Sequence, residues 1–185
     1  MASSAKLSEL LLTVDEAAGL DAHGRTDAAV LVPMYGWPDR PGLVFTERRS
    51  DLRRHAGEIS FPGGRQDHPD EDLRSTALRE AQEEIGLDPA AVELVGALPP
   101  IGTYVTSYRV HPFVGLVAEN LSLEPNPSEV ASVLNFGLDD LRDAFAMRRL
   151  VRRGVPIRTP TFEVGHHLIW GATGRILQDL LQRLA

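Results

Sequence analysis

The chain has 185 residues, of which 43% are hydrophobic, enough apolar material for one well-packed core, so we expect a single domain over residues 1–185. Its net charge of −7 argues against a protein that binds nucleic acid by neutralising many phosphates, and the absence of cysteine excludes disulfides, thiol catalysis and cysteine-ligated zinc. The N-terminal apolar run is too short for a signal peptide or a membrane span, which predicts a cytoplasmic protein without membrane contact.

The first predicted elements are two strands joined by a turn. Residues 28–34 and 43–46 are apolar runs, and the segment between them, 37–42, is rich in proline and glycine. Residues 1–27 precede the first strand as an N-terminal extension with room for a short helix. This part of the chain predicts a hairpin at the start of a sheet.

The longest run of helical periodicity covers residues 71–85 and carries three glutamates within five positions. At about 100° per residue, Glu83 and Glu84 lie within roughly 60° on either side of Glu80, so the three carboxylates share one side of the helix. Like charges this close repel one another unless a cation lies among them. Carboxylate oxygens suit Mg²⁺ or Mn²⁺, hard ions that often bridge carboxylates to phosphates. A solvated acidic helix face is the alternative interpretation.

Neighbouring residues set the surroundings of these carboxylates. Arg79 stands four positions before Glu83 and can pair with it, and Gly86 is suited to end the helix. Upstream, Gly63 and Gly64 form a turn at the end of a strand, where the backbone can approach a ligand or a metal closely.

Residues 79–87, read REAQEEIGL, resemble the Nudix box, G-x5-E-x7-R-E-U-x-E-E-x-G-U, in which U is a bulky apolar residue. The match is full over this range, with alanine as a small residue at the first U position. Counting back from the box arginine places the box glutamate on Glu71 and the box glycine on Arg65, so one extra residue lies in the loop before the helix. Either Asp70 or Glu71 could fill the front acidic position, and either Asp67 or Asp70 could cap the helix.

Residues 44–64 resemble a second pattern, L-L-T-x-R-S-x3-R-x3-G-x3-F-P-G-G, which accompanies the coenzyme A pyrophosphatase branch of the Nudix hydrolases. The matching positions are Thr46, Arg48, Arg53, Gly57 and 61–64, whereas Val44 and Phe45 replace the leucines and Arg49 replaces the serine. The resemblance implies that Arg48, Arg53, Gly63 and Gly64 bind substrate, and arginine suits this because its guanidinium grips phosphate oxygens in pairs. A solvated basic loop is the alternative for the arginines.

The rest of the sequence predicts strands, turns and two helices. Strands are predicted over 92–96, 108–117, 129–134 and 161–164, helices over 138–147 and 172–184, and a solvated basic hairpin around 148–153. Tyr104 and Tyr108 could stack on adenine, although packing is the simpler interpretation. His166 and His167 are interpreted as structural rather than as ligands.

The resemblance implies the Nudix fold, an α/β fold with a mixed β-sheet in an α/β/α sandwich. It implies catalysis by Arg79, Glu80, Glu83 and Glu84, with the three glutamates holding Mg²⁺ or Mn²⁺. The implied reaction is hydrolysis of the diphosphate of coenzyme A or its thioesters to 3′,5′-ADP and 4′-phosphopantetheine or its acyl form. Glu129 resembles the acidic residue that Nudix enzymes often carry beyond the box, and Glu80 and Glu129 are both candidates for the general base.

Two other functions stay open on the sequence alone. One is a Nudix hydrolase of another nucleoside diphosphate derivative, and the other is a non-catalytic Nudix domain that binds a nucleotide. In each case the expected partner is a small molecule rather than nucleic acid or a membrane, and a homodimer is left open.

Overall fold

A computed structural model describes residues 2–51, 57–67, 72–103, 107–152 and 154–185. The elements before the central helix are α1 (Ala2–Leu10), α2 (Val14–Ala18), β1 (Thr26–Tyr35), β2 (Gly42–Arg48), β3 (Ile59–Ser60) and β4 (Gly63–Arg65). The middle of the chain forms α3 (Leu73–Ile85), the 3-10 turn η1 (Pro89–Ala91), β5 (Glu93–Ala97), β6 (Ile101–Gly102) and β7 (Tyr108–Leu116). The last elements are β8 (Val130–Gly137), α4 (Leu138–Asp143), β9 (Phe145–Arg152), β10 (Val155–Val164), β11 (His167–Ile169) and α5 (Gly171–Arg183).

The larger sheet is mixed. Its strands follow the order β3-β2-β1-β7-β5, with β4 added to β1, β6 to β7 and β8 to β2. Strand β1 runs parallel to β7 and antiparallel to β2 and β4, so Ala29 has His111 on one side and Gly64 on the other. The predicted hairpin of the first two strands is confirmed by the antiparallel pairing of β1 with β2.

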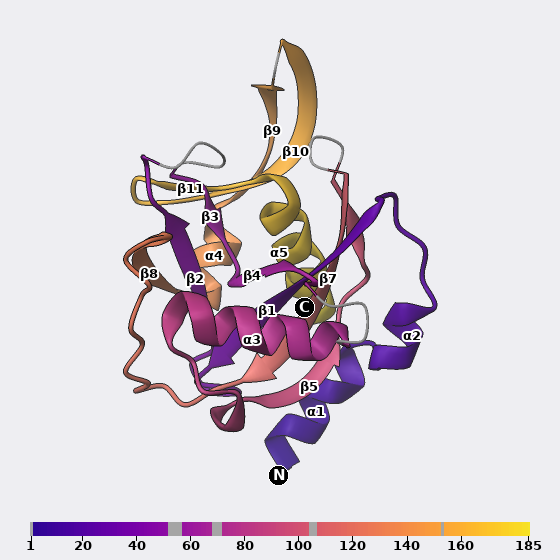
Figure 1. Ribbon diagram of the computed structural model, residues 1–185, viewed down its shortest axis with the longest axis vertical. Coiled ribbons are helices and arrows are strands. Elements are labelled where there is room, and N and C mark those ends of the chain that lie inside the picture. Colours follow the sequence, from indigo (N-terminus) through magenta and orange to yellow (C-terminus); the bar gives the residue numbers. More distant parts are fainter. Residues whose placement is uncertain (1, 52–56, 68–71, 104–106, 153) are drawn as a thin grey trace.

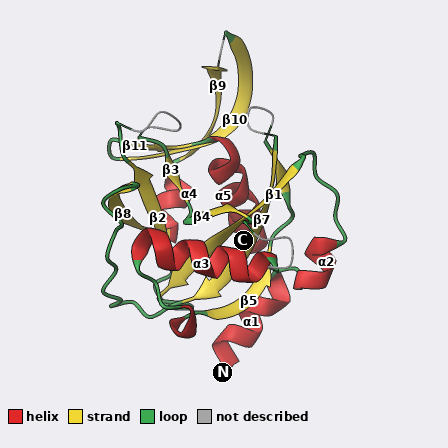
Figure 2. Cartoon of the chain, in the orientation of Figure 1, coloured by secondary structure: helices red, strands yellow, loops and turns green. Residues whose placement is uncertain are grey.

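Helices cover both faces of this sheet (Figures 1 and 2). Alternate residues of β1 point to opposite faces, which gives the sheet two apolar surfaces. On one face, Ala81 and Ile85 of α3 are fully buried in a cluster with Leu31 of β1. On the other face, residues of α1, α4 and α5 form the second cluster, which includes Leu7 and Leu177. The predicted α/β/α sandwich is confirmed, and the N-terminal helix contributes to its core.

Helix α3 begins later than the sequence predicted. Its N-cap is Asp72, whose carboxylate accepts a hydrogen bond from the Ser75 backbone N–H at 2.8 Å. The expectation that Asp67 or Asp70 caps the helix is therefore wrong. At the other end Gly86 adopts a left-handed conformation (φ 67°) and closes the helix, as predicted.

A second sheet contains β9, β10 and β11. The predicted helix over 138–147 is wrong in its second half, because α4 ends at Asp143 and the chain continues as β9. Phe145 pairs across the sheet with Phe162 of β10, with ring centroids 5.4 Å apart, and this contact favours the strand over another helical turn. No helix in the described ranges is long and apolar enough to cross a membrane.

Candidate active site

The second sequence pattern folds into a hairpin that delivers Arg48 to helix α3. Thr46 is buried, and its hydroxyl lies 3.2 Å from the Ser60 carbonyl oxygen across the β2–β3 pair. The Arg48 backbone N–H donates to the Glu58 carbonyl and its carbonyl accepts from the Gly57 N–H. Arg48 is thus held at the end of β2, directly beside the C-terminal half of α3.

Glu84 is the buried carboxylate of the site, with only 6% of its side chain exposed. Its Oε2 accepts a hydrogen bond from the Gly63 backbone N–H at 3.2 Å, and its Oε1 lies 3.7 Å from a terminal nitrogen of Arg48. Burial raises the pKa of Glu84 to about 7, although the Gly63 hydrogen bond and the Arg48 charge oppose that shift. This carboxylate has been removed from water without receiving a full set of partners.

Glu80 lies one helical turn earlier and faces Gly64. The turn predicted at Gly63 and Gly64 is wrong, because both residues belong to β4 and pair with β1. A methyl group at Gly64 would come within 2.5 Å of the Glu80 carboxylate, so only glycine leaves room for it there. Burial raises the pKa of Glu80, whereas the hydrogen bond and charge of Arg79 lower it. Gly63 therefore contacts Glu84, and Gly64 lies against Glu80.

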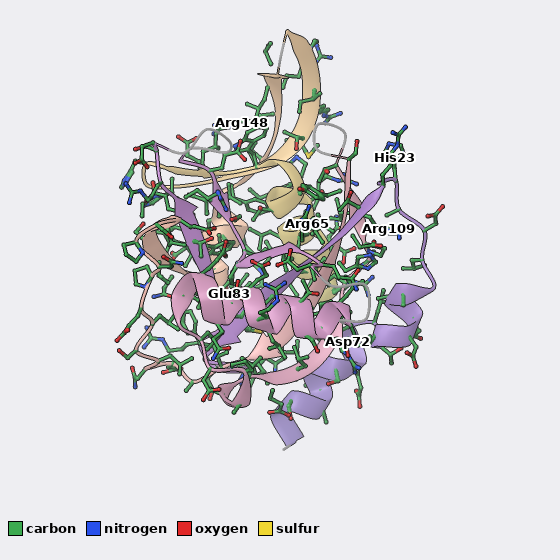
Figure 3. All side chains as sticks on the ribbon, in the orientation of Figure 1. His23, Arg65, Asp72, Glu83, Arg109 and Arg148 are labelled. Atoms are coloured by element: carbon green, nitrogen blue, oxygen red, sulfur yellow. The ribbon has the colours of Figure 1, made fainter. Side chains whose placement is uncertain are left out.

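Arg79 connects the helix to the loop in front of it. Its guanidinium donates to Glu80 at 3.0 Å and to Glu83 at 3.2 Å, which confirms the predicted pairing with Glu83. It also donates to the Arg65 carbonyl at 3.3 Å and lies 3.8 Å from the carboxylate of Asp67. Figure 3 shows Glu83 on α3 and Arg65 on β4, the two elements that Arg79 joins.

The three box carboxylates share a side of α3, but they differ in surroundings. Glu80 and Glu84 point to Gly64 and Gly63 of β4, whereas Glu83 is 57% exposed and pairs with Arg79. Within the described ranges, no three His, Asp or Glu side chains are close enough together to form a finished cation site. The possible metal ligands are nevertheless all carboxylate oxygens, which a hard divalent ion prefers. The buried oxygens of Glu84 remain available to such an ion.

Glu129 lies across from the helix, beside Arg48. Its carboxylate is 3.9 Å from a terminal nitrogen of Arg48, and half of its side chain is exposed. The turn that carries it is fixed by Arg49, whose side chain donates to the Pro127 carbonyl and whose backbone N–H donates to the Glu129 carbonyl. The Nε of Arg48 is buried and has no hydrogen-bond partner in the part of the chain that the structure describes. Arg48 therefore lies between Glu84 and Glu129, and its Nε–H remains available as a hydrogen-bond donor.

Some predicted residues lie outside this cluster or outside the described residues. Arg53, Asp70, Glu71 and Tyr104 lie outside the described residues. Tyr108 packs against the core.

The two histidine rings at the β10–β11 turn contact each other in a tilted arrangement. The ring centroids of His166 and His167 are 3.9 Å apart, and His167 also lies 5.7 Å from Phe136.

Sequence reasoning missed two polar contacts near the site. Asp67 was considered only as a helix cap, yet it lies within ion-pair distance of Arg65 and Arg79. Asp27 receives two hydrogen bonds from Arg109, at 2.6 and 2.9 Å, and lies 3.0 Å from His111. The Arg109 hydrogen bonds lower the pKa of Asp27. Local spacing carries no signal for this pair, because 82 positions separate the two residues.

The buried charge of Glu84 predicts a pH dependence of stability in the metal-free protein. Its pKa is about 7 when folded and 4.5 when unfolded, so between these values the folded state binds a proton that the unfolded state has released. The contribution of Glu84 to the free energy of unfolding is therefore full below pH 4.5 and is lost as the pH rises through 7, by roughly 2–4 kcal/mol. Urea unfolding with a chelator, compared between wild type and Glu84→Gln across this range, measures the effect. Parallel curves for the two proteins would contradict it.

Comparison with known proteins identifies the family. Residues 25–154 match the NUDIX domain. The chain is 40% identical over 161 residues to the uncharacterized Nudix hydrolase NudL of Citrobacter koseri, covering 84% of this chain and 81% of the relative. It is also 40% identical over 158 residues to NudL of Salmonella paratyphi B, covering 83% and 80% of the two chains.

Solved structures share the fold at low sequence identity. A MutT/nudix family protein from Enterococcus faecalis matches with a TM-score of 0.57 and 14% identity over 86% of this chain and 61% of the other. An Ap4A hydrolase of C. elegans in a binary complex matches with a TM-score of 0.51 and 18% identity, over 63% and 82% of the two chains. The NUDIX domain of Shewanella oneidensis NrtR, complexed with ADP ribose, has a TM-score of 0.50 and 17% identity, over 64% and 77%. With its box helix seated on a mixed sheet and its domain match spanning most of its length, the chain belongs to the Nudix family and is a Nudix hydrolase, one of the pyrophosphohydrolases.

Proposed function

We propose that this enzyme hydrolyses the diphosphate of coenzyme A or acyl-coenzyme A, giving 3′,5′-ADP and 4′-phosphopantetheine or its acyl form. The observation that carries the proposal is the position of Arg48, which lies 3.7 Å from Glu84. Arg48 belongs to the pattern that resembles the coenzyme A branch, and Glu84 belongs to the Nudix box. The two patterns, separate in the sequence, therefore meet at one point where an anionic linkage would be bound.

The residues of the site divide the work of binding and proton transfer. Arg48 has a buried N–H without a partner in the described ranges, and an arginine in that state suits an incoming phosphate oxygen. The Gly63 backbone N–H donates a hydrogen bond to Glu84, and the missing side chain of Gly64 leaves room for the Glu80 carboxylate, so the two glycines position the two carboxylates. Two carboxylates are candidates for the general base that takes the proton of the attacking water: Glu80, which is paired with Arg79, and Glu129, which lies beside Arg48.

Nudix hydrolases generally use divalent metal ions, and in this chain Glu80, Glu83 and Glu84 would hold Mg²⁺ or Mn²⁺. A bound divalent ion neutralises the diphosphate and acidifies a water molecule. The chain's own residues fix the positions of the charged groups, and phosphoryl chemistry depends mainly on such positioning and on charge stabilisation. Arg79 orients Glu80 and Glu83 through hydrogen bonds to both.

A substrate panel tests the proposal. We expect the enzyme with Mg²⁺ or Mn²⁺ to cleave coenzyme A with a kcat/KM about tenfold or more above that for diadenosine tetraphosphate and ADP-ribose, because a hydrogen bond to a charged group contributes about 1.5–3 kcal/mol and each increment of about 1.4 kcal/mol is a factor of ten. Product analysis in ¹⁸O-water would show one labelled product and so identify the phosphorus that is attacked. Slow cleavage of coenzyme A beside rapid cleavage of ADP-ribose would assign the enzyme to another nucleoside diphosphate derivative. Tight binding of coenzyme A without cleavage would favour a non-catalytic nucleotide-binding domain.

A further inference from the structure

Strands β9 and β10 form a two-stranded arm, residues 145–164, that projects from the rest of the protein (Figure 1). Their register pairs Phe145 with Phe162 at the base and Arg152 with Val155 near the tip. Strand β9 is an edge of its sheet, because β10 is its only neighbour in the described ranges. Exposed edges of this kind are common sites of association between chains.

One face of the arm carries exposed apolar side chains. Side chains alternate along a strand, so Phe145, Met147 and Val151 of β9 point to the same face. All three are exposed, and 75% of Val151 is accessible to solvent. Pro156 of β10 lies opposite Val151 and extends the same surface. An exposed apolar surface on a projecting arm indicates a contact with another molecule.

The same face carries two arginines that repel each other. Arg149 and Arg158 are direct partners across the two strands, and like charges in that position are destabilising. Neither guanidinium has a carboxylate within 4 Å in the part of the chain that the structure describes. On the opposite face Arg148 is paired with Glu163 at 2.5 Å, and Figure 3 shows Arg148 near the base of the arm. An acidic partner would relieve the repulsion between Arg149 and Arg158, whereas Arg148 on the opposite face is already paired.

Charge on the rest of the chain supplies such a partner. The whole chain has a net charge of −7, and the arm, with five arginines and one glutamate, contributes +4, so the remainder carries −11. Helix α4 exposes Asp139, Asp140 and Asp143. Asp139 is paired with Arg142 of the same helix at 3.0 Å, so Asp140 and Asp143 are the aspartates that remain for a partner. The described residues offer Asp143 no ion-pair partner.

The arm cannot bring its arginines to α4 of its own chain. Arg149 lies four residues beyond Phe145, about 13 Å along an extended strand that leads away from the helix. Pairing between two arms is disfavoured as well, because it would add the like charges of one arm to those of the other. The acidic helix of another copy of the chain satisfies both conditions.

We propose that the arm of one copy docks on α4 of a second copy, so that two equivalent contacts form a symmetric homodimer. Arg149 and Arg158 face the aspartates of α4, and the apolar side chains of the arm pack around them. Each chain gives one arm and receives one, as a two-fold interface requires. The assembly does not depend on which substrate the enzyme cleaves.

Charge reversal in the full-length protein, followed by sedimentation velocity, tests this interface. The arm-reversed variant carries Arg149→Glu and Arg158→Glu, and the α4-reversed variant carries Asp140→Arg and Asp143→Arg. Each variant alone should lose the dimer, whereas an equal mixture of the two should regain it, because both contacts of the mixed dimer again join opposite charges. A control with Lys6→Glu and Arg25→Glu has the same change of net charge as the arm-reversed variant at exposed positions away from the arm and from α4, and it should stay dimeric. Circular dichroism and melting temperatures establish that every variant is folded.

The outcomes separate the proposal from its alternatives. A dimer in wild type, its loss in both variants and its return in the mixture would support the interface. A monomeric wild type, or arm-reversed and α4-reversed variants that remain dimers, would overturn it. A mixture that stays monomeric although both variants are folded would show that the arm meets a different acidic surface, and the assignment to α4 would then be wrong.

Discussion

Replacing Glu84 with glutamine is expected to lower kcat for diphosphate hydrolysis by about 10²–10³-fold, as the loss of several kcal/mol of charge stabilisation would do. The fold should remain, because the amide oxygen of glutamine can still accept the hydrogen bond from the Gly63 N–H. At neutral and higher pH the variant should melt at the same temperature as wild type or above it, since a buried charge held 3.7 Å from Arg48 is only partly compensated. Steady-state kinetics and thermal unfolding measure the two effects separately.

Two further substitutions show whether the effect belongs to Glu84. Glu83→Gln changes an exposed carboxylate of the same helix, and its turnover should fall in the same direction without a change in melting temperature. Glu93→Gln removes an exposed carboxylate on β5, away from Gly63 and Gly64, and should leave both turnover and melting temperature unchanged. Near-wild-type turnover in Glu84→Gln would remove this residue from the metal site and, with it, the mechanism given above.

The second large effect is expected from a single methyl group at Gly64. In Gly64→Ala the new Cβ would lie 2.5 Å from the Glu80 carboxylate, which is the movable end of a side chain. The carboxylate should shift while the fold persists, and a misplacement of about 1 Å can lower turnover by about 10²-fold. A kcat lowered about 10²-fold together with a nearly unchanged melting temperature would confirm that Gly64→Ala disturbs the site and not the fold.

Gly63→Ala provides the contrast. Its new Cβ would lie 2.4 Å from the Ala29 carbonyl oxygen and 2.6 Å from the Val30 Cα, atoms of the backbone that cannot move aside. We expect this variant to lose roughly 1–3 kcal/mol of stability through overpacking. Gly19→Ala, where the nearest atom is 3.5 Å away, controls for the added methyl group. Equal losses of stability in Gly63→Ala and Gly64→Ala would contradict the distinction.

The parts of the site that the sequence predicted are those set by local spacing. The side of α3 that carries Glu80 and Glu84 follows from helical periodicity. The pairing of Arg79 with Glu83 follows from their four-residue separation, and the closing conformation of Gly86 follows from the lack of a Cβ.

The parts that were predicted wrongly depend on contacts with distant residues. Several aspartates precede α3, and any of them could cap an isolated helix. Local spacing does not distinguish among them, and in the structure Asp72 has this role. Similarly, the residues after Asp143 are compatible with a helix until β10 supplies a partner strand, and that partner lies more than ten residues further along the chain.

The parallel pairing of β1 with β7 has a consequence for how the enzyme acquires activity during folding. Residues that become direct neighbours there, such as Asp27 and Arg109, are 82 positions apart, and α3 lies within the connection between the two strands. Closing so long a loop is slow, and its entropic cost precedes any reward from the contacts that it permits. Activity should therefore return during refolding only when β1 and β7 have paired on either side of this connection, in step with the tertiary signal that reports the pairing.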